Sequence, residues 1–126
     1  MSSLALLRVT IEPLEDACRI RVSGDLDLST ADRLSSALDA ARADGVTTLL
    51  DLSAVSFIDS AGLRVLLRAA RAVDAHHWAC FIVRVSGVVS RLVEVSGTTS
   101  RLPLVAPSES PERIATLSTG TRRRVG

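Results

Sequence analysis

The sequence predicts a single α/β domain built on a mainly parallel sheet. Apolar residues make up 47% of the 126 residues, which is enough for one core, and only 2% are aromatic, so that core is aliphatic. Along the chain the hydrophobic period switches repeatedly between the two-residue repeat of strands and the repeat of helices. Strand–helix alternation after an opening hairpin favours parallel strands joined by right-handed crossovers.

An antiparallel hairpin is predicted at the start of the domain. Strand-forming residues run from Leu4 to Ile11, and the segment from Cys18 to Val22 alternates strictly between apolar and polar residues. A short turn around Glu15-Asp16 joins the two runs. Gly24 is then expected to break the second strand.

The first strand–helix unit follows this hairpin. A helix is predicted after a cap at Ser29 or Thr30, with its end near Gly45, where a left-handed terminal residue is expected. A compact strand over 46–52 comes next. Residues 53–59 are expected to form a connection.

A second helix, another strand and a third helix are predicted beyond this connection. The apolar stripe of the second helix consists of Leu63, Leu66, Leu67, Ala70 and Val73. Residues 79–85 are nearly all apolar, which is typical of a strand buried on both faces. Ser86 can cap the third helix, which is expected to stop at Gly97.

The last elements are short. Residues 102–105 indicate an edge strand, because proline is tolerated there. Ser110 followed by proline predicts a fourth helix. The domain is thus expected over 4–118, followed by a disordered basic tail over 119–126 that contains Arg122, Arg123 and Arg124.

Composition and motifs exclude several classes of function. A formal charge of +1 gives no basic field for direct binding to nucleic acid, and no apolar stretch is long enough to span a membrane, so a cytoplasmic protein is expected. The two cysteines are predicted to be buried free thiols. The adjacent residues His76 and His77 point apart on a helix and cannot share a metal ion. No enzyme motif is present, so no catalytic residue, cofactor or metal is predicted.

The informative segment is Asp59-Ser60-Ala61-Gly62, where a strand leads into a helix. Ser60 lies where unpaired backbone N–H groups favour negative charge, so a phosphate on its hydroxyl would be stabilised, and Gly62 would leave the approach open. Alternatively, Asp59 or Ser60 caps the helix and Gly62 only packs on the sheet. The two interpretations are compatible if Asp59 caps and Ser60 is presented.

Asp25 and Asp27 form a close pair of acidic residues after the second predicted strand. The connections that follow parallel strands gather at one edge of a sheet, so both carboxylates are expected beside Ser60. They would repel a phosphate there. No basic residue close in sequence is expected to pair with it.

Several segments together resemble one known family. They are Gly24-Asp25-Leu26-Asp27, Ser29-Thr30-Ala31, the run from Asp51 to Leu63, the run from Val85 to Leu92, and Val95-Ser96-Gly97. With these motifs the chain resembles a STAS domain, and within that family it is most similar to bacterial anti-sigma factor antagonists. The resemblance implies a strand–helix superhelix, an additional N-terminal strand and about four helices.

The resemblance also implies a role in transcription regulation. The unphosphorylated antagonist would bind an anti-sigma factor, itself a Ser/Thr kinase with a GHKL-type fold, and release a sigma factor. The kinase would phosphorylate Ser60, and a Ser/Thr phosphatase would reverse this. The residues implied at the contact with the partner are Asp25, Asp27, Asp59, Ala61 and Gly62. The alternative is a non-catalytic STAS scaffold subunit of a stress-signalling or lipid-transport complex, in which Ser60 has no regulatory role.

Overall fold

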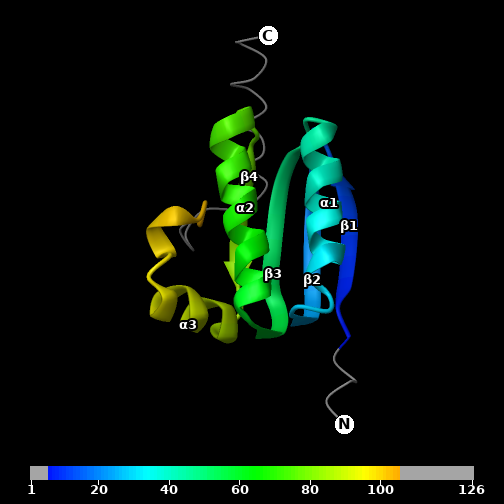
Figure 1. The fold of residues 1–126 in the computed structure, drawn as a ribbon. Helices are drawn as coiled ribbons and strands as arrows, with labels where there is room; N and C mark the ends of the chain where they lie inside the picture. The colour runs from blue at the N-terminus through cyan, green and yellow to red at the C-terminus, as the bar shows by residue number, and fades with distance from the viewer. Residues whose placement is uncertain (1–5, 106–126) are drawn as a thin grey trace.

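The structure is a computed structural model that describes residues 6–105, and its elements alternate as the sequence predicts (Figure 1). In chain order they are β1 (Arg8–Leu14), β2 (Ala17–Leu26), α1 (Ala31–Ala43), β3 (Thr47–Ile58), α2 (Ser60–His76), β4 (Cys80–Val85), α3 (Gly87–Ser96) and the 3-10 turn η2 (Thr99–Arg101). The expected fourth helix and the basic tail lie outside the described residues.

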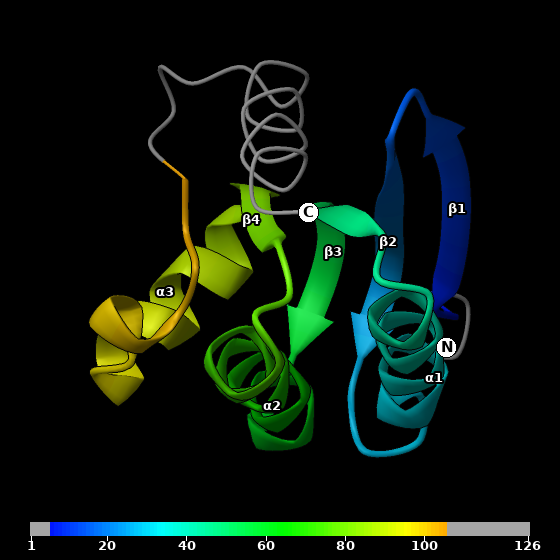
Figure 2. The same cartoon turned by 90° about the horizontal axis from the view of Figure 1, so that it is seen from above.

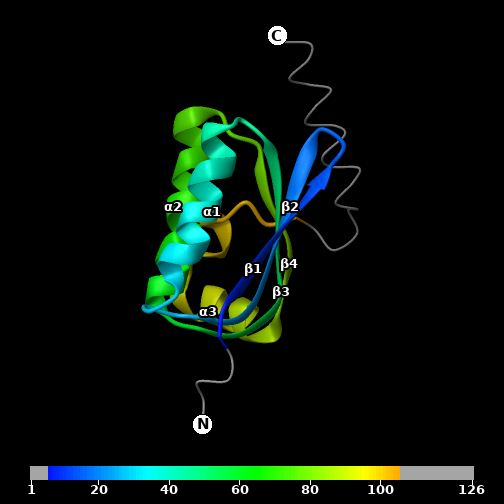
Figure 3. The same ribbon diagram turned by 90° about the vertical axis from the view of Figure 1, so that its right-hand side faces the viewer.

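The four strands form one sheet in the order β1-β2-β3-β4. The predicted hairpin is confirmed, because β1 pairs antiparallel with β2 and Leu14 faces Ala17 across the turn. β3 pairs parallel with β2, and β4 pairs parallel with β3. The helices α1 and α2 lie side by side against one face of the sheet, and α3 lies beyond β4 (Figures 2 and 3).

Three strands extend beyond their predicted ends, and the first of them, β1, continues past Ile11 to Leu14. Gly24 does not break β2, because the strand continues through a register shift at that glycine, whose φ is +92°. The expected connection over 53–59 is wrong for most of its length, since β3 continues to Ile58. Val55 and Ile58 are buried in the core, so this half of the strand is held by packing as well as by pairing with β2.

The core lies between the sheet and the helices and is aliphatic, as the composition predicts. Its fully buried members include Ile20, Leu26, Leu50 and Leu66. In α2 the predicted stripe is only partly in the core, because Leu66 is fully buried whereas Leu67 is half-buried. β4 is also less buried than predicted, with residues of intermediate exposure alternating along it.

The third helix has the predicted ends. The side chain of Ser86 accepts a hydrogen bond from the backbone N–H of Val89 at 3.5 Å, and Gly97 ends the helix in the left-handed region at φ +71°. Beyond the helix, the expected edge strand is reduced to one parallel bridge between Leu104 and Ile82.

Both cysteines, Cys18 and Cys80, are buried free thiols, as predicted. Within residues 6–105 no helix is both long enough and apolar enough to cross a membrane.

Candidate functional site at the carboxyl edge of the sheet

Asp59 caps helix α2 and leaves Ser60 free. The carboxylate oxygen Oδ1 of Asp59 accepts hydrogen bonds from the N–H groups of Ala61 at 2.9 Å and Gly62 at 3.2 Å. Asp59 therefore satisfies two of the N–H groups that have no partner inside the helix. Ser60 is the first helical residue and is exposed, and its hydroxyl makes no hydrogen bond to any residue within 6–105. Of the two possible caps, Asp59 is the one the structure uses.

Gly62 is buried and brings α2 close to the end of β2. A Cβ atom at this position would lie 2.6 Å from the carbonyl oxygen of Leu26, 2.8 Å from its Cγ and 2.9 Å from Cγ1 of Ile58. The backbone N–H of Asp59 donates to the same carbonyl of Leu26 at 3.3 Å. The geometry thus supports the packing interpretation of Gly62. Neither Gly62 nor the half-buried Ala61 offers a partner an exposed side chain.

The loop after β2 is organised around Asp27. Its Oδ1 accepts hydrogen bonds from the backbone N–H of Ser29 at 3.0 Å and from the hydroxyl of Ser29 at 2.8 Å. The hydroxyl of Thr30 lies 2.7 Å from the carbonyl oxygen of Asp25 and donates to it. The hydroxyl of Ser29, followed by that of Thr30, stabilises the ionised carboxylate and lowers the pKa of Asp27 from its ordinary value of 3.8.

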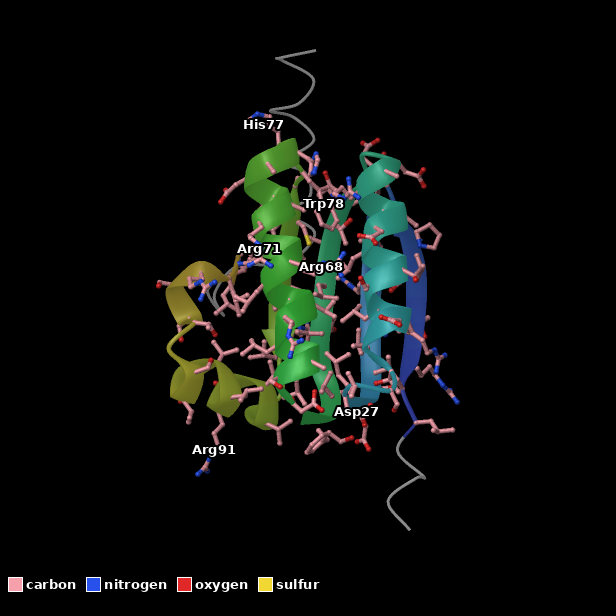
Figure 4. All side chains as sticks on the ribbon, viewed as in Figure 1. Asp27, Arg68, Arg71, His77, Trp78 and Arg91 are labelled. Carbon is pink, nitrogen blue, oxygen red and sulfur yellow. The ribbon has the colours of Figure 1, made fainter. Side chains whose placement is uncertain are left out.

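Asp25 joins this loop to the end of β3. Ser56 donates a hydrogen bond from its hydroxyl to Oδ1 of Asp25 at 3.2 Å, and Asp25 faces Phe57 in the register of the parallel pair. Since β3 leads directly into α2, the acidic loop and the start of α2 lie at one edge of the sheet (Figure 4). The structure therefore brings Asp25 and Asp27 to the same edge as Ser60.

This edge also carries exposed apolar side chains that were not predicted from the sequence. They are Leu28, 80% exposed, Phe57, 49% exposed, and Val88, 42% exposed. Each lies where the chain leaves the carboxyl end of a different strand: β2, β3 or β4. Leu28 carried a usable signal, because it interrupts a polar run and falls outside the apolar stripe of α1. We call Leu28, Phe57 and Val88 the apolar edge.

A basic residue near Ser60 was also missed. The expectation that no cation lies close in sequence is wrong, because Arg64 follows Ser60 by four residues on the same helix. Residues four apart are neighbours on a helix surface. Their spacing in the sequence was the signal that could have revealed this pair.

This arrangement is suited to recognition by another protein. Within residues 6–105 no group of three or more His, Cys, Asp or Glu residues is placed to hold a metal ion. The carboxylates of Asp27 and Asp59 are already engaged by hydroxyl and backbone donors. A groove of about 390 Å³, lined in part by Arg68 and Trp78, lies between α1 and α2 and does not include Ser60. What the edge presents is a free hydroxyl, ordered carboxylates and exposed apolar side chains.

The chain is similar to a known protein family and to several proteins of known structure. A family model described as "Mlab, STAS domain" matches residues 9–106. An anti-sigma factor antagonist from Mycobacterium paratuberculosis is similar over 90% of this chain and 94% of its own, with 25% sequence identity and a TM-score of 0.73.

Two structures of SpoIIAA share the fold at lower identity. The unphosphorylated form of this anti-sigma factor antagonist is 21% identical over 85% of this chain and 96% of its own, with a TM-score of 0.67. The phosphorylated form, from Bacillus, is 21% identical over 85% of this chain and 99% of its own, with a TM-score of 0.64.

Proposed function

Because the chain belongs to the STAS family, as its sequence motifs indicated, we propose that it is an anti-sigma factor antagonist that acts by binding and is switched by phosphorylation of Ser60. The observation that carries this proposal is the hydroxyl of Ser60, which is exposed at the start of α2 and not used for capping. The role is that of a cytoplasmic binding protein and not of an enzyme. The similarity to an anti-sigma factor antagonist over nearly the whole chain supports it.

The proposed partner is an anti-sigma factor that is also a GHKL-type Ser/Thr kinase. The unphosphorylated protein binds it through the carboxyl edge of the sheet and so releases the sigma factor. The apolar edge supplies the desolvated centre of the contact, and the carboxylates of Asp25 and Asp27 form its polar surroundings. A Ser/Thr phosphatase restores the binding form.

Phosphorylation acts in this proposal by local charge and needs no change of fold. A phosphate adds about −1.5 to −2 charges. It would stand in the first turn of α2 at an edge that already carries Asp25, Asp27 and Asp59. Like charges brought together at an interface cost several kcal/mol, which corresponds to a loss of affinity of about a hundredfold or more.

The first experiment locates the phosphate. The protein is incubated with ATP and a purified anti-sigma factor kinase from the same organism, and the product is analysed by mass spectrometry. One phosphate is expected, on Ser60, and none on the Ser60→Ala variant. Ser36→Ala, which removes an exposed serine of α1, is the matched control and should be modified like the wild type. Phosphate retained in Ser60→Ala would refute the assignment.

The second experiment tests the effect of charge on binding. Calorimetry with the same anti-sigma factor should give weaker binding for Ser60→Asp than for Ser60→Ala, because only the former adds charge. The effect of Asp should be partial, since it carries about half the charge of a phosphoserine. Circular dichroism should show the same fold for both variants. Equal binding by Ser60→Asp, Ser60→Ala and the phosphorylated protein would contradict a charge-based switch.

A constitutive scaffold subunit, in which Ser60 is not modified, is the second candidate, because the matching family model describes a STAS domain and no phosphorylation. Phosphopeptide mapping of the protein purified from its own cells, together with identification of its co-purified proteins, separates the two. Phosphate on Ser60 and a co-purified anti-sigma factor support the switch. Unmodified Ser60 under all growth conditions, with a stable multisubunit complex, supports the scaffold.

A further inference from the structure

Arg64 lies one helical turn after Ser60 on the exposed side of α2. Ser60, Arg64 and Arg68 recur at spacings of four residues, and all three are exposed. Cβ atoms of residues four apart on a helix are separated by about 5–6 Å. Arg64 makes no ion pair or hydrogen bond with any residue in the described range 6–105, so its guanidinium is available to an anion.

The other charged groups around the first turn of α2 are acidic or directed elsewhere. Asp25 and Asp27 belong to the end of β2 and the loop after it, and Asp59 caps α2. On α1, Arg33 donates a hydrogen bond to the carbonyl oxygen of Leu7 at 2.7 Å, beside the hairpin. On α3, Arg91 points away from the body of the protein (Figure 4). An anion on Ser60 would therefore be repelled on one side and attracted toward Arg64.

We propose that Arg64 is a positioning residue that binds the phosphate of phosphorylated Ser60 and holds it along the exposed side of α2. This inference rests on the proposed modification of Ser60. The order of the pair is favourable, because an acidic group N-terminal to a basic one by four residues stabilises a helix better than the reverse order. Guanidinium groups also bind phosphate oxygens through two parallel hydrogen bonds.

The pair gives phosphorylation a second effect on the surface. The phosphate adds negative charge at the edge of the sheet and at the same time neutralises one charge of a basic row on α2, formed by Arg64, Arg68 and Arg71. A partner that contacts both the edge of the sheet and the basic row would therefore be affected twice by a single modification. A carboxylate at position 60 is shorter and carries less charge, so Ser60→Asp reproduces this second effect only in part.

The test uses the full chain with phosphoserine incorporated at position 60 during translation, so that no kinase is required. The second pKa of the phosphate is measured by phosphorus NMR as a function of pH. Arg64 favours the dianion and lowers this pKa, so Arg64→Gln should raise it by about 0.2–0.4. Arg68→Gln, two turns from Ser60, is the matched control and should change it by less than a third of that amount. Arg64→Lys should restore part of the shift.

A loss of structure would not produce this pattern. The unphosphorylated Arg64→Gln and Arg68→Gln proteins should melt like the wild type, because both side chains are exposed. An unchanged phosphate pKa in Arg64→Gln, or equal changes in Arg64→Gln and Arg68→Gln, would overturn the pairing. Because the phosphate is installed without a kinase, this result is independent of whether a kinase modifies Ser60, so failure of the pairing and failure of the proposed function are distinguishable.

Discussion

Gly62 is required for space and not for its backbone conformation. Its position would place a Cβ atom 2.6 Å from the carbonyl oxygen of Leu26, a backbone atom that cannot move without disturbing the end of β2. Gly62→Ala should therefore reduce the free energy of unfolding by about 1–3 kcal/mol, as overpacking does in cores. Urea denaturation followed by circular dichroism measures the loss.

Gly87 provides the matched control for this prediction. It is the first residue of α3, and a Cβ there would meet no atom within 4 Å. Gly87→Ala should leave stability unchanged or raise it by up to about 1 kcal/mol, because alanine restricts the unfolded chain. If the two alanine variants were equally stable, the close approach of α2 to Leu26 would be wrong.

The sequence identified the residues that could cap α2, but it did not show which of two neighbouring residues does so. Asp59 and Ser60 are both good capping residues, so composition alone left either as the cap. The backbone decides: Asp59 is extended at φ −119° and ψ −170°, whereas Ser60 is already helical. The four-residue spacing of Ser60 and Arg64, by contrast, was enough to predict that they are neighbours on the helix. The burial of Gly62 depends on a contact with Leu26, 36 positions earlier, which no local pattern contains.

Helix α2 shows how a helical stripe divides between core and surface. The pattern predicts that Leu66 and Leu67 share one apolar face, but they differ by 100° around the axis. Leu66 is fully buried and Leu67 is half-buried. Leu66→Ala should therefore destabilise the protein by about 2–5 kcal/mol, the combined cost of lost transfer energy and a cavity. Leu67→Ala should cost less than half as much in the same urea titration, and a larger loss for Leu67→Ala would mean that α2 is rotated.

The ends of the strands were the least predictable part of the elements. In β2, glycine at position 24 indicated a break, yet the strand accommodates it as an irregularity and continues to Leu26. In β3, Ser53, Ala54 and Ser56 are exposed polar or small residues typical of a connection. Pairing of Ala54 and of neighbouring residues with β2 nonetheless keeps this stretch in the sheet. Contacts between strands distant in sequence thus override local propensity at both places.

The order of strands and helices was predictable because the spacing of apolar residues changes at each boundary between a strand and a helix. The hairpin, the parallel strands and the three helices of residues 6–105 follow the predicted succession. The carboxyl edge follows from topology alone, since β2, β3 and β4 are parallel and each leads into a helix from its carboxyl end. The apolar edge does not follow from topology, because exposure of Phe57 or Leu28 depends on how the surrounding chain covers it.

The absence of lysine and tyrosine gives the whole molecule an unusually simple titration at high pH. Burial raises the pKa of Cys80 to about 12, with a further contribution from nearby Cys18, whose own pKa is raised by burial. Above the ordinary value of 9.0 the unfolded thiols ionise while the folded thiol of Cys80 stays protonated, so folding stability should fall as pH rises from 9 to 12.

The expected slope from Cys80 approaches about 1.4 kcal/mol per pH unit between the unfolded and folded pKa values of its thiol. Urea titrations at pH 8.0, 9.5 and 10.5 measure it, and Cys80→Ala, although less stable at every pH, should show a clearly smaller slope than the wild type. Thiol reagents at pH 8 should label Cys80 only after denaturation, because the side chain is 1% exposed. A pH-independent stability, or rapid labelling of Cys80 in the native protein, would contradict the burial of this thiol.

The apolar edge is the part of the surface that the proposed function assigns to the contact with the partner. Phe57 is half-exposed at the centre of the edge, between the loop of Leu28 and the start of α3, and large aromatic side chains dominate the energy of protein contacts. Phe57→Ala should weaken binding to the anti-sigma factor at least about tenfold in calorimetry, the effect of losing about 1.4 kcal/mol. Ile11 on β1, 55% exposed and away from this edge, is the matched control, and Ile11→Ala should bind like the wild type. Equal affinity of the two variants, with unchanged melting curves, would place the contact elsewhere on the molecule.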